Sequence, residues 1–394
     1  MTKLERKMVP FIFNLPTKVI FGCGTITHLG TEAEGLGQKT MLVTYPQALR
    51  RLGMLEHILK SLIQDLKVHG LDTVLYEKVE ANPRIATVDE GARMAREEQV
   101  DLVIGLGGGS AMDVAKGIAL ASTGIGSIRR YLKRELEVTS PILPIIQVPT
   151  TASSGSETNS AMVITDWETR EKIALNTPQL FAKVAIIDPE LTLTVPAKAT
   201  AQGGVDIFCS AAELYITTKE PSPLTDGILE TIMKIVVDYL PKVLARPDDI
   251  EARTQLCWVA ALYSSQFARL GGGAGFWTCH GIEHAISGYY DIAHGDGLAA
   301  LLPSWMKYTF PVTEERFRQL GSSVFGEEDG LEATLKWLER IGMKLRLRDL
   351  RVEHERAQEL ANLAIKTAPP SSPFDKHPKP LDTESIAQII RDAY

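Results

Sequence analysis

The sequence predicts an α/β N-terminal domain with a parallel, dinucleotide-binding sheet, followed by an all-α C-terminal domain. Short apolar runs alternate with helical patterns in the first half of the 394-residue chain, as in the βαβ units of a parallel sheet. A glycine-rich turn follows the most apolar of these runs. After residue 196 the pattern changes to a 3.6-residue period with few indications of strands. We therefore expect two domains, residues 1–196 and residues 197–394.

The strands expected in the first half are short and rich in aliphatic and β-branched residues. They are Lys18–Gly22, Thr40–Thr44, Thr73–Glu77, Asp101–Gly105 and Leu143–Val148. Helical periodicity fills two of the gaps, at residues 54–69 and 87–98. Asp101–Gly105 is almost entirely apolar, which is typical of a strand buried on both faces.

Bulk properties exclude several classes of protein. With 44% apolar and 23% charged residues the chain is ordinary globular material, and it has no apolar run long enough to span a membrane. The first residues lack the apolar core of a signal peptide, and the four cysteines form no CxxC pair, so we expect reduced thiols and a cytoplasmic location. A net charge of -7 argues against nucleic-acid binding, which leaves a small molecule as the expected partner.

The glycine-rich turn has the properties of a pyrophosphate site. Gly107, Gly108 and Gly109 let the backbone approach a ligand closely. Ser110 can cap the following helix, whose first N–H groups and partial positive charge favour an anion. The spacing matches neither GxGxxG nor a Walker loop, so a tight turn without a ligand is the alternative.

A loop crowded with hydroxyl groups, residues 149–166, follows the next expected strand. Thr150, Thr151, Ser154 and Ser156 can donate hydrogen bonds to phosphate, ribose or carboxamide groups. Ligands of open α/β sheets bind at the carboxyl ends of the strands, where this loop lies. Turn formation alone is the alternative explanation for so many serines and threonines.

The second half combines expected helices with a cluster of histidines. The helices are residues 227–244, 252–270, 329–341 and 382–394. His280 and His284 are four residues apart and so share one helical face, and His294 follows a turn-rich segment, residues 287–291. Imidazoles held in this way can bind iron or zinc, although histidines also fall together by chance.

A carboxylate from elsewhere can complete such a metal site. Asp206, Ser210 and Glu213 lie on one face of an expected helix that begins with two glycines. Asp206 is therefore either a metal ligand or a plain acidic residue of the first helical turn, which the helix dipole favours.

Five motifs in order resemble the iron-containing (group III) alcohol dehydrogenases. They are GGGS, PTTASSGSE, DPELTLTVP, GGVD and HGIEHAISGYYDIAHGDGLA. The last one resembles most the branch with butanol dehydrogenases and aldehyde reductases. The resemblance implies a fold like that of dehydroquinate synthase and a homodimer. It also implies metal binding by Asp206, His280 and His294, proton relay by His284, a pyrophosphate at residues 107–110, and contacts of Thr150 and Thr151 near the nicotinamide.

One departure from the family puts the metal in question. Iron-dependent members have a third histidine at the position of Ser210, and a serine hydroxyl is a poor ligand. Asp206 and two histidines form the set that glycerol dehydrogenases use for zinc, with one open position. Cys209 is a possible substitute ligand, or else a small buried residue. Iron, zinc and a site that has lost its metal therefore all remain open.

A second departure concerns the cofactor. Members that prefer NAD often carry an aspartate after the second strand, where this chain has Tyr45 and, further on, Arg50 and Arg51. Two arginines without an acid favour NADP over NAD, although a glycine-serine turn typical of NADP users is also missing.

The expected activity is that of a metal-dependent alcohol dehydrogenase or aldehyde reductase. It transfers a hydride between NADPH or NADH and a small aldehyde or primary alcohol. Phe267, Phe276 and Trp277 can form an apolar wall for the substrate, or belong to the core. The alternatives are a zinc-dependent polyol dehydrogenase, a lyase of the dehydroquinate synthase type, and a relative without metal or activity.

Overall fold

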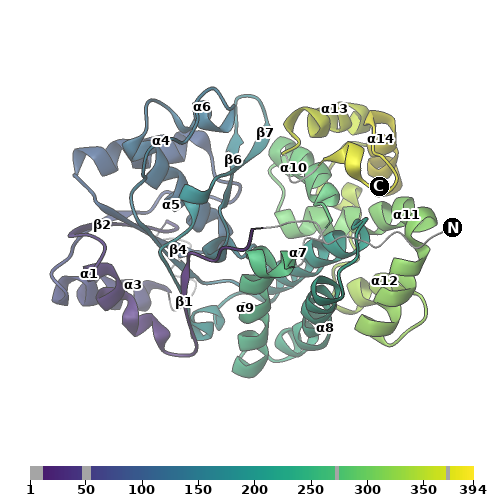
Figure 1. The fold of residues 1–394 in the computed structure, drawn as a ribbon, viewed down its shortest axis with the longest axis horizontal. Helices are drawn as coiled ribbons and strands as arrows, with labels where there is room; N and C mark the ends of the chain where they lie inside the picture. The colour runs from purple at the N-terminus through teal and green to yellow at the C-terminus, as the bar shows by residue number, and fades with distance from the viewer. Residues whose placement is uncertain (1–11, 47–54, 271–274, 370–372) are drawn as a thin grey trace.

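The computed structural model describes residues 12–46, 55–270, 275–369 and 373–394, and the two halves of the chain differ in kind (Figure 1). The first half contains all the strands of the described residues, and the second half consists of helices. This α/β arrangement followed by helices confirms the predicted fold class. The boundary at residue 196 stays a proposal; the first long helix after the sheet begins at Ala197.

Within the described residues the sheet has six strands, and each neighbouring pair is parallel. Across the sheet the order is β1 (Lys18–Phe21), β8 (Val184–Ile187), β5 (Ile145–Pro149), β4 (Leu102–Gly107), β2 (Lys39–Val43) and β3 (Asp72–Tyr76). The chain adds β3 outside β2 and then returns to place β4 on the other side. The carboxyl ends of β2 and β4 therefore flank the point where the strand order reverses, and open α/β sheets bind ligands at such points.

Helices cover both faces of this sheet. They are α1 (Leu29–Glu34), α3 (Leu55–Val68), α4 (Ile85–Glu97), α5 (Gly109–Thr123) and α6 (Ile128–Leu132). Leu102 and Ile104 of β4 belong to the core with α1 and α3, whereas Val103 belongs to the core with α4 and α5. Because side chains alternate between the faces of a strand, burial on both sides requires the continuous apolar run seen in the sequence.

A two-stranded hairpin projects from the sheet domain. It consists of β6 (Ala161–Asp166) and β7 (Glu171–Asn176), which pair antiparallel. The prediction that residues 149–166 form one continuous loop is wrong beyond residue 160. The dense run of serines and threonines ends there, and the apolar run Ala161–Ile164 begins the strand. The hairpin and β8 are the strands that the sequence did not reveal.

The helical half is built around α7 (Ala197–Ile216), which is buried over most of its length. The other helices are α8 (Pro223–Ala245), α9 (Ile250–Ser264), α10 (Thr278–Tyr290), α11 (His294–Leu320), α12 (Gly330–Arg340), α13 (Ala357–Thr367) and α14 (Thr383–Asp392). Helix α7 contacts α8, α9, α10 and α11. It is thus the element on which the helices carrying the histidines are arranged.

Short helical turns join these elements. They are η1 (Thr25–His28), η2 (Ser156–Thr158), η3 (Pro178–Leu180), η4 (Pro189–Thr192), η5 (Gln266–Arg269), the π-turn η6 (Gly321–Phe325), η7 (Leu347–Leu350), η8 (His354–Arg356) and η9 (Phe374–Lys376). None of the helices in the described ranges offers an apolar stretch of the length that crossing a membrane requires.

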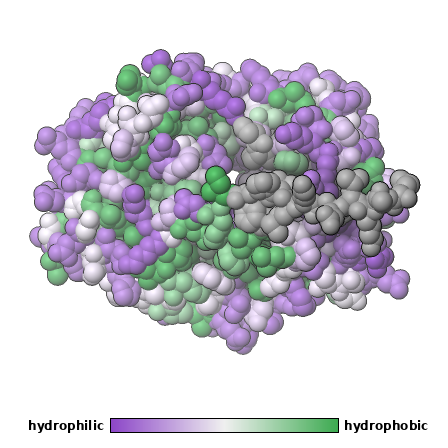
Figure 2. All heavy atoms as spheres, in the orientation of Figure 1, coloured by the Kyte–Doolittle hydropathy of each residue, from purple (hydrophilic) through white to green (hydrophobic). Residues whose placement is uncertain are grey.

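Apolar side chains are exposed around the edge strand β1. Ile12 is 90% exposed, and Phe13, Leu15 and Val19 are exposed as well. Figure 2 shows hydrophobic residues gathering near the middle of this face, over the region where Figure 1 draws β1 and α9. Strand β1 pairs with β8 on one side, so its other edge faces away from the sheet.

Candidate metal and dinucleotide site

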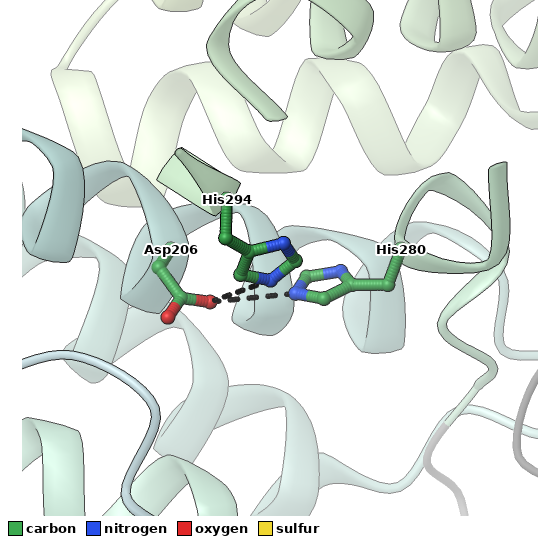
Figure 3. A group of neighbouring side chains, drawn as sticks. All are labelled: Asp206, His280 and His294. Atoms are coloured by element: carbon green, nitrogen blue, oxygen red, sulfur yellow. Dashed lines mark hydrogen bonds and ion pairs between the residues drawn. The ribbon is translucent and has the colours of Figure 1, made fainter. Parts of the chain in front are cut away.

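Three helices bring Asp206, His280 and His294 together (Figure 3). Asp206 lies halfway along α7, His280 in the first turn of α10, and His294 is the first residue of α11. The Oδ1 atom of Asp206 is 3.4 Å from Nε2 of His280 and 3.9 Å from Nε2 of His294. The three ligand atoms lie within 4.8 Å of one another, which is close enough for one ion to contact all of them.

The structure corrects two details of the sequence interpretation. Asp206 is not in a first helical turn, because α7 begins at Ala197. The two glycines serve packing instead: a Cβ atom on Gly203 would lie 2.2 Å from the carbonyl oxygen of Ala152. Residues 287–290 form the last turn of α10 rather than a loop, and a Cβ atom on Gly288 would meet the backbone of β7. In both places glycine permits close contact between elements, which a sequence cannot distinguish from a turn.

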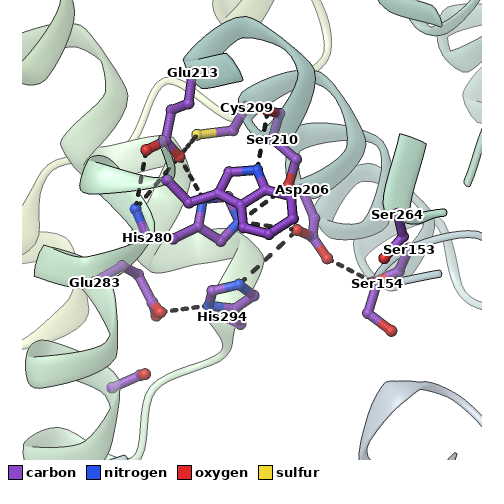
Figure 4. A network of polar contacts seen from close by, with 12 residues as sticks. Ser153, Ser154, Asp206, Cys209, Ser210, Glu213, Ser264, His280, Glu283 and His294 are labelled. Carbon is purple, nitrogen blue, oxygen red and sulfur yellow. Dashed lines mark hydrogen bonds and ion pairs between the residues drawn. The ribbon is translucent and has the colours of Figure 1, made fainter. Parts of the chain in front are cut away.

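Buried glutamates hold both histidines (Figure 4). The Nδ1 atom of His280 pairs with Glu213 on α7, and the Nδ1 atom of His294 pairs with Glu283 on α10. Both glutamate side chains are 0% exposed. A carboxylate at Nδ1 keeps the proton on that atom and leaves the Nε2 lone pair free for a metal. The role of Glu283 was not predicted, although it lies inside the HGIEH motif.

The carboxylates of the site are held in their charged form. Burial alone would raise the pKa of Asp206, but its hydrogen bond to His280 and the charges of both histidines lower it below the usual range. Burial would likewise raise the pKa of Glu283, yet His294 and Lys172 lower it to about 2. Ser153 also donates a 2.9 Å hydrogen bond to Asp206. A cluster of buried anions and imidazoles of this kind favours a bound cation.

His284 lies one turn after His280 on the same helix face. Its ring centre is 6.4 Å from that of His280 and 5.5 Å from that of His294. Burial and the nearby charges of Lys172 and His294 lower its pKa well below the usual value. The imidazole is therefore neutral at neutral pH and can accept a proton.

Ser210 and Cys209 point to different places. The Oγ atom of Ser210 is 3.1 Å from Nε2 of His280, so its hydroxyl faces the candidate metal position. The thiol of Cys209 donates instead to Glu213, at 3.6 Å, and groups with Cys279 rather than with Asp206. Cys209 is fully buried, which fits a small core residue better than a substitute metal ligand.

The glycine turn and the hydroxyl-rich loop are neighbours because their strands are paired. Gly107 at the end of β4 lies opposite Pro149 at the end of β5, and the amide of Thr150 donates to the carbonyl of Gly107. A Cβ atom on Gly108 would lie 2.9 Å from Oγ1 of Thr151, and one on Gly109 would lie 2.6 Å from Oγ of Ser154. Backbone amides and hydroxyl groups thus surround a space next to the turn, and a side chain in place of these glycines would fill that space.

Two hydroxyls of this region have other partners or positions than expected. Ser110 is not the cap of α5, since the helix already begins at Gly109 and the capping position is Gly108. The hydroxyl of Ser156 donates to Asp113 at 2.7 Å, which ties the loop to α5.

Arg50 and Arg51, which favoured NADP, lie outside the described residues.

A cavity of about 140 Å³ lies between the hydroxyl-rich loop and the candidate metal site. It is bounded by residues of the loop, the hairpin and the helical half. They are Asp113, Ser154, Ser156, Asn159, Ala161, Val163, Ala174, Asp206, Ser210, Tyr263, Ser264, Trp277, His280, His284, His294 and Pro369. Trp277 lies in its wall as expected, whereas Phe267 and Phe276 are not among the described lining residues.

Comparison with known proteins identifies related chains. A family model described as iron-containing alcohol dehydrogenase matches residues 16–189, and the C-terminal model of that family matches residues 200–394. NADH-dependent butanol dehydrogenase A of Clostridium acetobutylicum is 32% identical over 98% of this chain and 100% of its own. NAD-dependent methanol dehydrogenase of Bacillus methanolicus is 30% identical, over 97% and 99%. The crystal structure of NADH-dependent butanol dehydrogenase A from Thermotoga maritima superposes with a TM-score of 0.91 at 30% identity, covering 98% of this chain and 99% of that one.

Proposed function

The chain belongs to the iron-containing alcohol dehydrogenase family, and we propose that Asp206, His280 and His294 hold its metal while the turn at Gly107–Gly109 holds its nicotinamide cofactor. The protein is an alcohol dehydrogenase that transfers a hydride between a nicotinamide cofactor and a small alcohol or aldehyde. The observation that carries our assignment is the convergence of three ligand atoms within 4.8 Å on one wall of the cavity. A polyol dehydrogenase and an inactive relative are not better supported.

The donor set fits a divalent metal. One carboxylate oxygen and two imidazole nitrogens suit iron and zinc alike, and three protein ligands leave a position open for substrate. A cation bound there supplies Lewis-acid polarisation of the substrate oxygen. Glu213 and Glu283 orient the two imidazoles through their Nδ1 atoms, so that both Nε2 atoms face Asp206.

We assign the proton transfer to His284. Its imidazole lines the cavity and is neutral, so it can take the hydroxyl proton of an alcohol and return it to solvent. In the opposite direction it passes a proton from solvent to the product alcohol. We propose aldehyde reduction as the main direction, because protonation of an alkoxide is easy at neutral pH.

The cofactor side relies on backbone and hydroxyl groups. The N-terminal amides of α5 would bind the pyrophosphate, with Thr151 and Ser154 beside the turn. Thr150 and Ser156 hold the loop in place through the carbonyl of Gly107 and the carboxylate of Asp113. The bound cofactor supplies or accepts the hydride, and the protein contributes alignment.

We propose NADH as the cofactor in preference to NADPH, since several related proteins are named as NADH-dependent. For the metal we propose three protein ligands, because Ser210 has only a hydroxyl, a poor ligand, at the position where a fourth ligand could lie. Three protein ligands suit zinc as well as iron. For the substrate we propose a short aliphatic aldehyde such as butanal, which the small cavity can accommodate next to Trp277.

We propose a homodimer in the cytoplasm. The exposed apolar side chains before β1, and the edge of that strand that pairs with no other strand in the described part of the chain, offer a surface for a second copy. Four cysteines without a disulfide are typical of a reducing compartment. Light scattering coupled to size exclusion measures the mass in solution, and a mass of one chain contradicts the dimer.

Metal analysis tests the main assignment. The protein is purified anaerobically without chelator, analysed for metals, and assayed with NADH and NADPH on butanal before and after addition of iron or zinc. We expect about one metal ion per chain and turnover that depends on it. Absence of bound metal together with no turnover after the addition would mean that the site is no longer a metal site.

A further inference from the structure

The side chain of Tyr45 lies on the glycine turn. Tyr45 is the second residue after β2, and its hydroxyl oxygen accepts a 3.2 Å hydrogen bond from the backbone N–H of Gly108. A Cβ atom on Gly107 would lie 2.8 Å from the Tyr45 ring, and one on Gly108 would lie 3.1 Å from its hydroxyl. The phenol of Tyr45 therefore lies in the space that side chains at positions 107 and 108 would fill.

This is the space in which an anion would bind. Gly108 is the residue before α5, a helix of 15 residues whose first amides carry a partial positive charge. Tyr45 reaches it because Val43 of β2 lies opposite Gly105 of β4, so that both strands end at the same edge. The N–H group of Gly108, which donates to Tyr45, could otherwise donate a hydrogen bond to a phosphate oxygen.

We propose that the Tyr45 hydroxyl and a cofactor phosphate oxygen compete for the backbone N–H of Gly108, so that Tyr45 must leave this position when the dinucleotide binds. The inference rests on the proposed cofactor site at the glycine turn. Tyr45 would then lower the affinity for the cofactor, because its hydrogen bond with Gly108 must break each time the cofactor binds. Burial raises the pKa of Tyr45 to about 12, so the phenol is neutral and is a weaker acceptor than a charged phosphate.

Removal of the hydroxyl tests the proposal. The Tyr45→Phe variant keeps the ring but leaves the Gly108 N–H without its acceptor from this side chain. NADH fluorescence titration of the full-length protein, without substrate, gives the dissociation constant. We expect it to fall by about three- to tenfold relative to wild type, the range that loss of one competing hydrogen bond produces. The melting temperature without cofactor should fall slightly.

Tyr131 provides a matched control. Its hydroxyl also accepts a backbone hydrogen bond, from Ile125 at 2.9 Å, and it packs in the same core at the far end of α5. Tyr131→Phe loses the same kind of bond away from the turn. It should lower the melting temperature without changing the dissociation constant for NADH.

The outcomes separate this inference from the site assignment. A Gly108→Ala variant places a methyl group against the turn and should weaken NADH binding. If it does so while Tyr45→Phe binds NADH equally well or more weakly, Tyr45 does not occupy a phosphate position. If Gly108→Ala binds NADH like wild type, the cofactor site itself lies elsewhere. Should the phenylalanine variant not fold, Tyr45→Leu also lacks the hydroxyl and is expected to bind NADH more tightly.

Discussion

The two half-sites of this molecule are built in opposite ways. The candidate metal site consists of side chains from three helices, and Glu213 and Glu283, both fully buried, fix the histidines in place. The glycine turn consists of backbone, and it depends on side chains being absent where Thr151 and Ser154 approach. The candidate metal site should therefore fail when a side chain is removed, and the proposed cofactor site should fail when one is added.

The largest expected effect comes from removing a metal ligand. His280→Ala deletes one of the three converging ligand atoms and leaves Glu213 without its imidazole partner. We expect turnover to fall by at least about a hundredfold, together with loss of bound metal. Elemental analysis and the butanal assay measure both. NADH binding should persist, because the turn at α5 is untouched; a variant that keeps wild-type turnover contradicts the metal mechanism.

Adding a side chain to the turn should have the complementary effect. A Cβ atom on Gly109 would lie 2.6 Å from Oγ of Ser154, so Gly109→Val crowds the proposed cofactor position. We expect the dissociation constant for NADH to rise by about tenfold or more, the cost of a lost ionic hydrogen bond to phosphate. Metal content should remain that of wild type. Loss of metal in this variant would show that the two half-sites do not behave independently.

The sequence predicted the side-chain site better than its surroundings. His280 and His294 lie in one short segment, so residue type and spacing already indicated a metal there, whereas the role of Asp206 came from the family resemblance. The glutamate partner of His294 was missed because a glutamate inside a helix is ordinary in sequence. Ser153, which donates to Asp206, was missed because nothing distinguishes it from the other serines of its loop.

The fold prediction was wrong where glycine or serine residues suggested a turn or loop but lie in, or next to, a helix or strand. The α/β order and five of the six sheet strands followed from apolar runs separated by helices. The hairpin of β6 and β7 was hidden behind a serine-rich loop, and Gly288 indicated a turn although it lets α10 pack on β7. Such close contacts depend on tertiary packing, which local sequence patterns do not encode.

A smaller effect is expected from the carboxylates behind the ligands. Glu213→Gln keeps the shape of the side chain and an acceptor for His280, but removes the charge that raises the basicity of the imidazole. Chelator competition should show metal affinity about tenfold to a hundredfold lower. Glu171→Gln is the control: Glu171 is also buried and pairs with Lys133 and Lys366 instead. Equal metal affinity in Glu213→Gln and wild type would refute the role of Glu213.

The two regions also differ in how their buried carboxyl groups titrate. Beside the candidate metal site, the pKa of Glu283 is lowered to about 2. Its charge stabilises the fold above its ordinary pKa of 4.5, and this contribution is lost as the pH falls from 4.5 through 2. In the hydroxyl-rich loop, burial raises the pKa of Glu157 to about 7, despite the nearby charge of Lys116. The two groups should therefore respond to pH with opposite signs.

Glu157→Gln tests this difference through stability. Between pH 4.5 and 7 folded Glu157 holds a proton that the unfolded chain has released, so its contribution to stability decreases as the pH rises from 4.5 to 7 and changes little above that. Glutamine cannot ionise, so the variant should match wild type in melting temperature at pH 5 and exceed it at pH 7.5, by a stability difference of about 1 to 3 kcal/mol. Lys116, whose pKa burial lowers to about 8, stays mostly protonated over this range. If the difference in melting temperature between the variant and wild type did not change between pH 5 and 7.5, Glu157 would be ionised in the folded protein over this whole range.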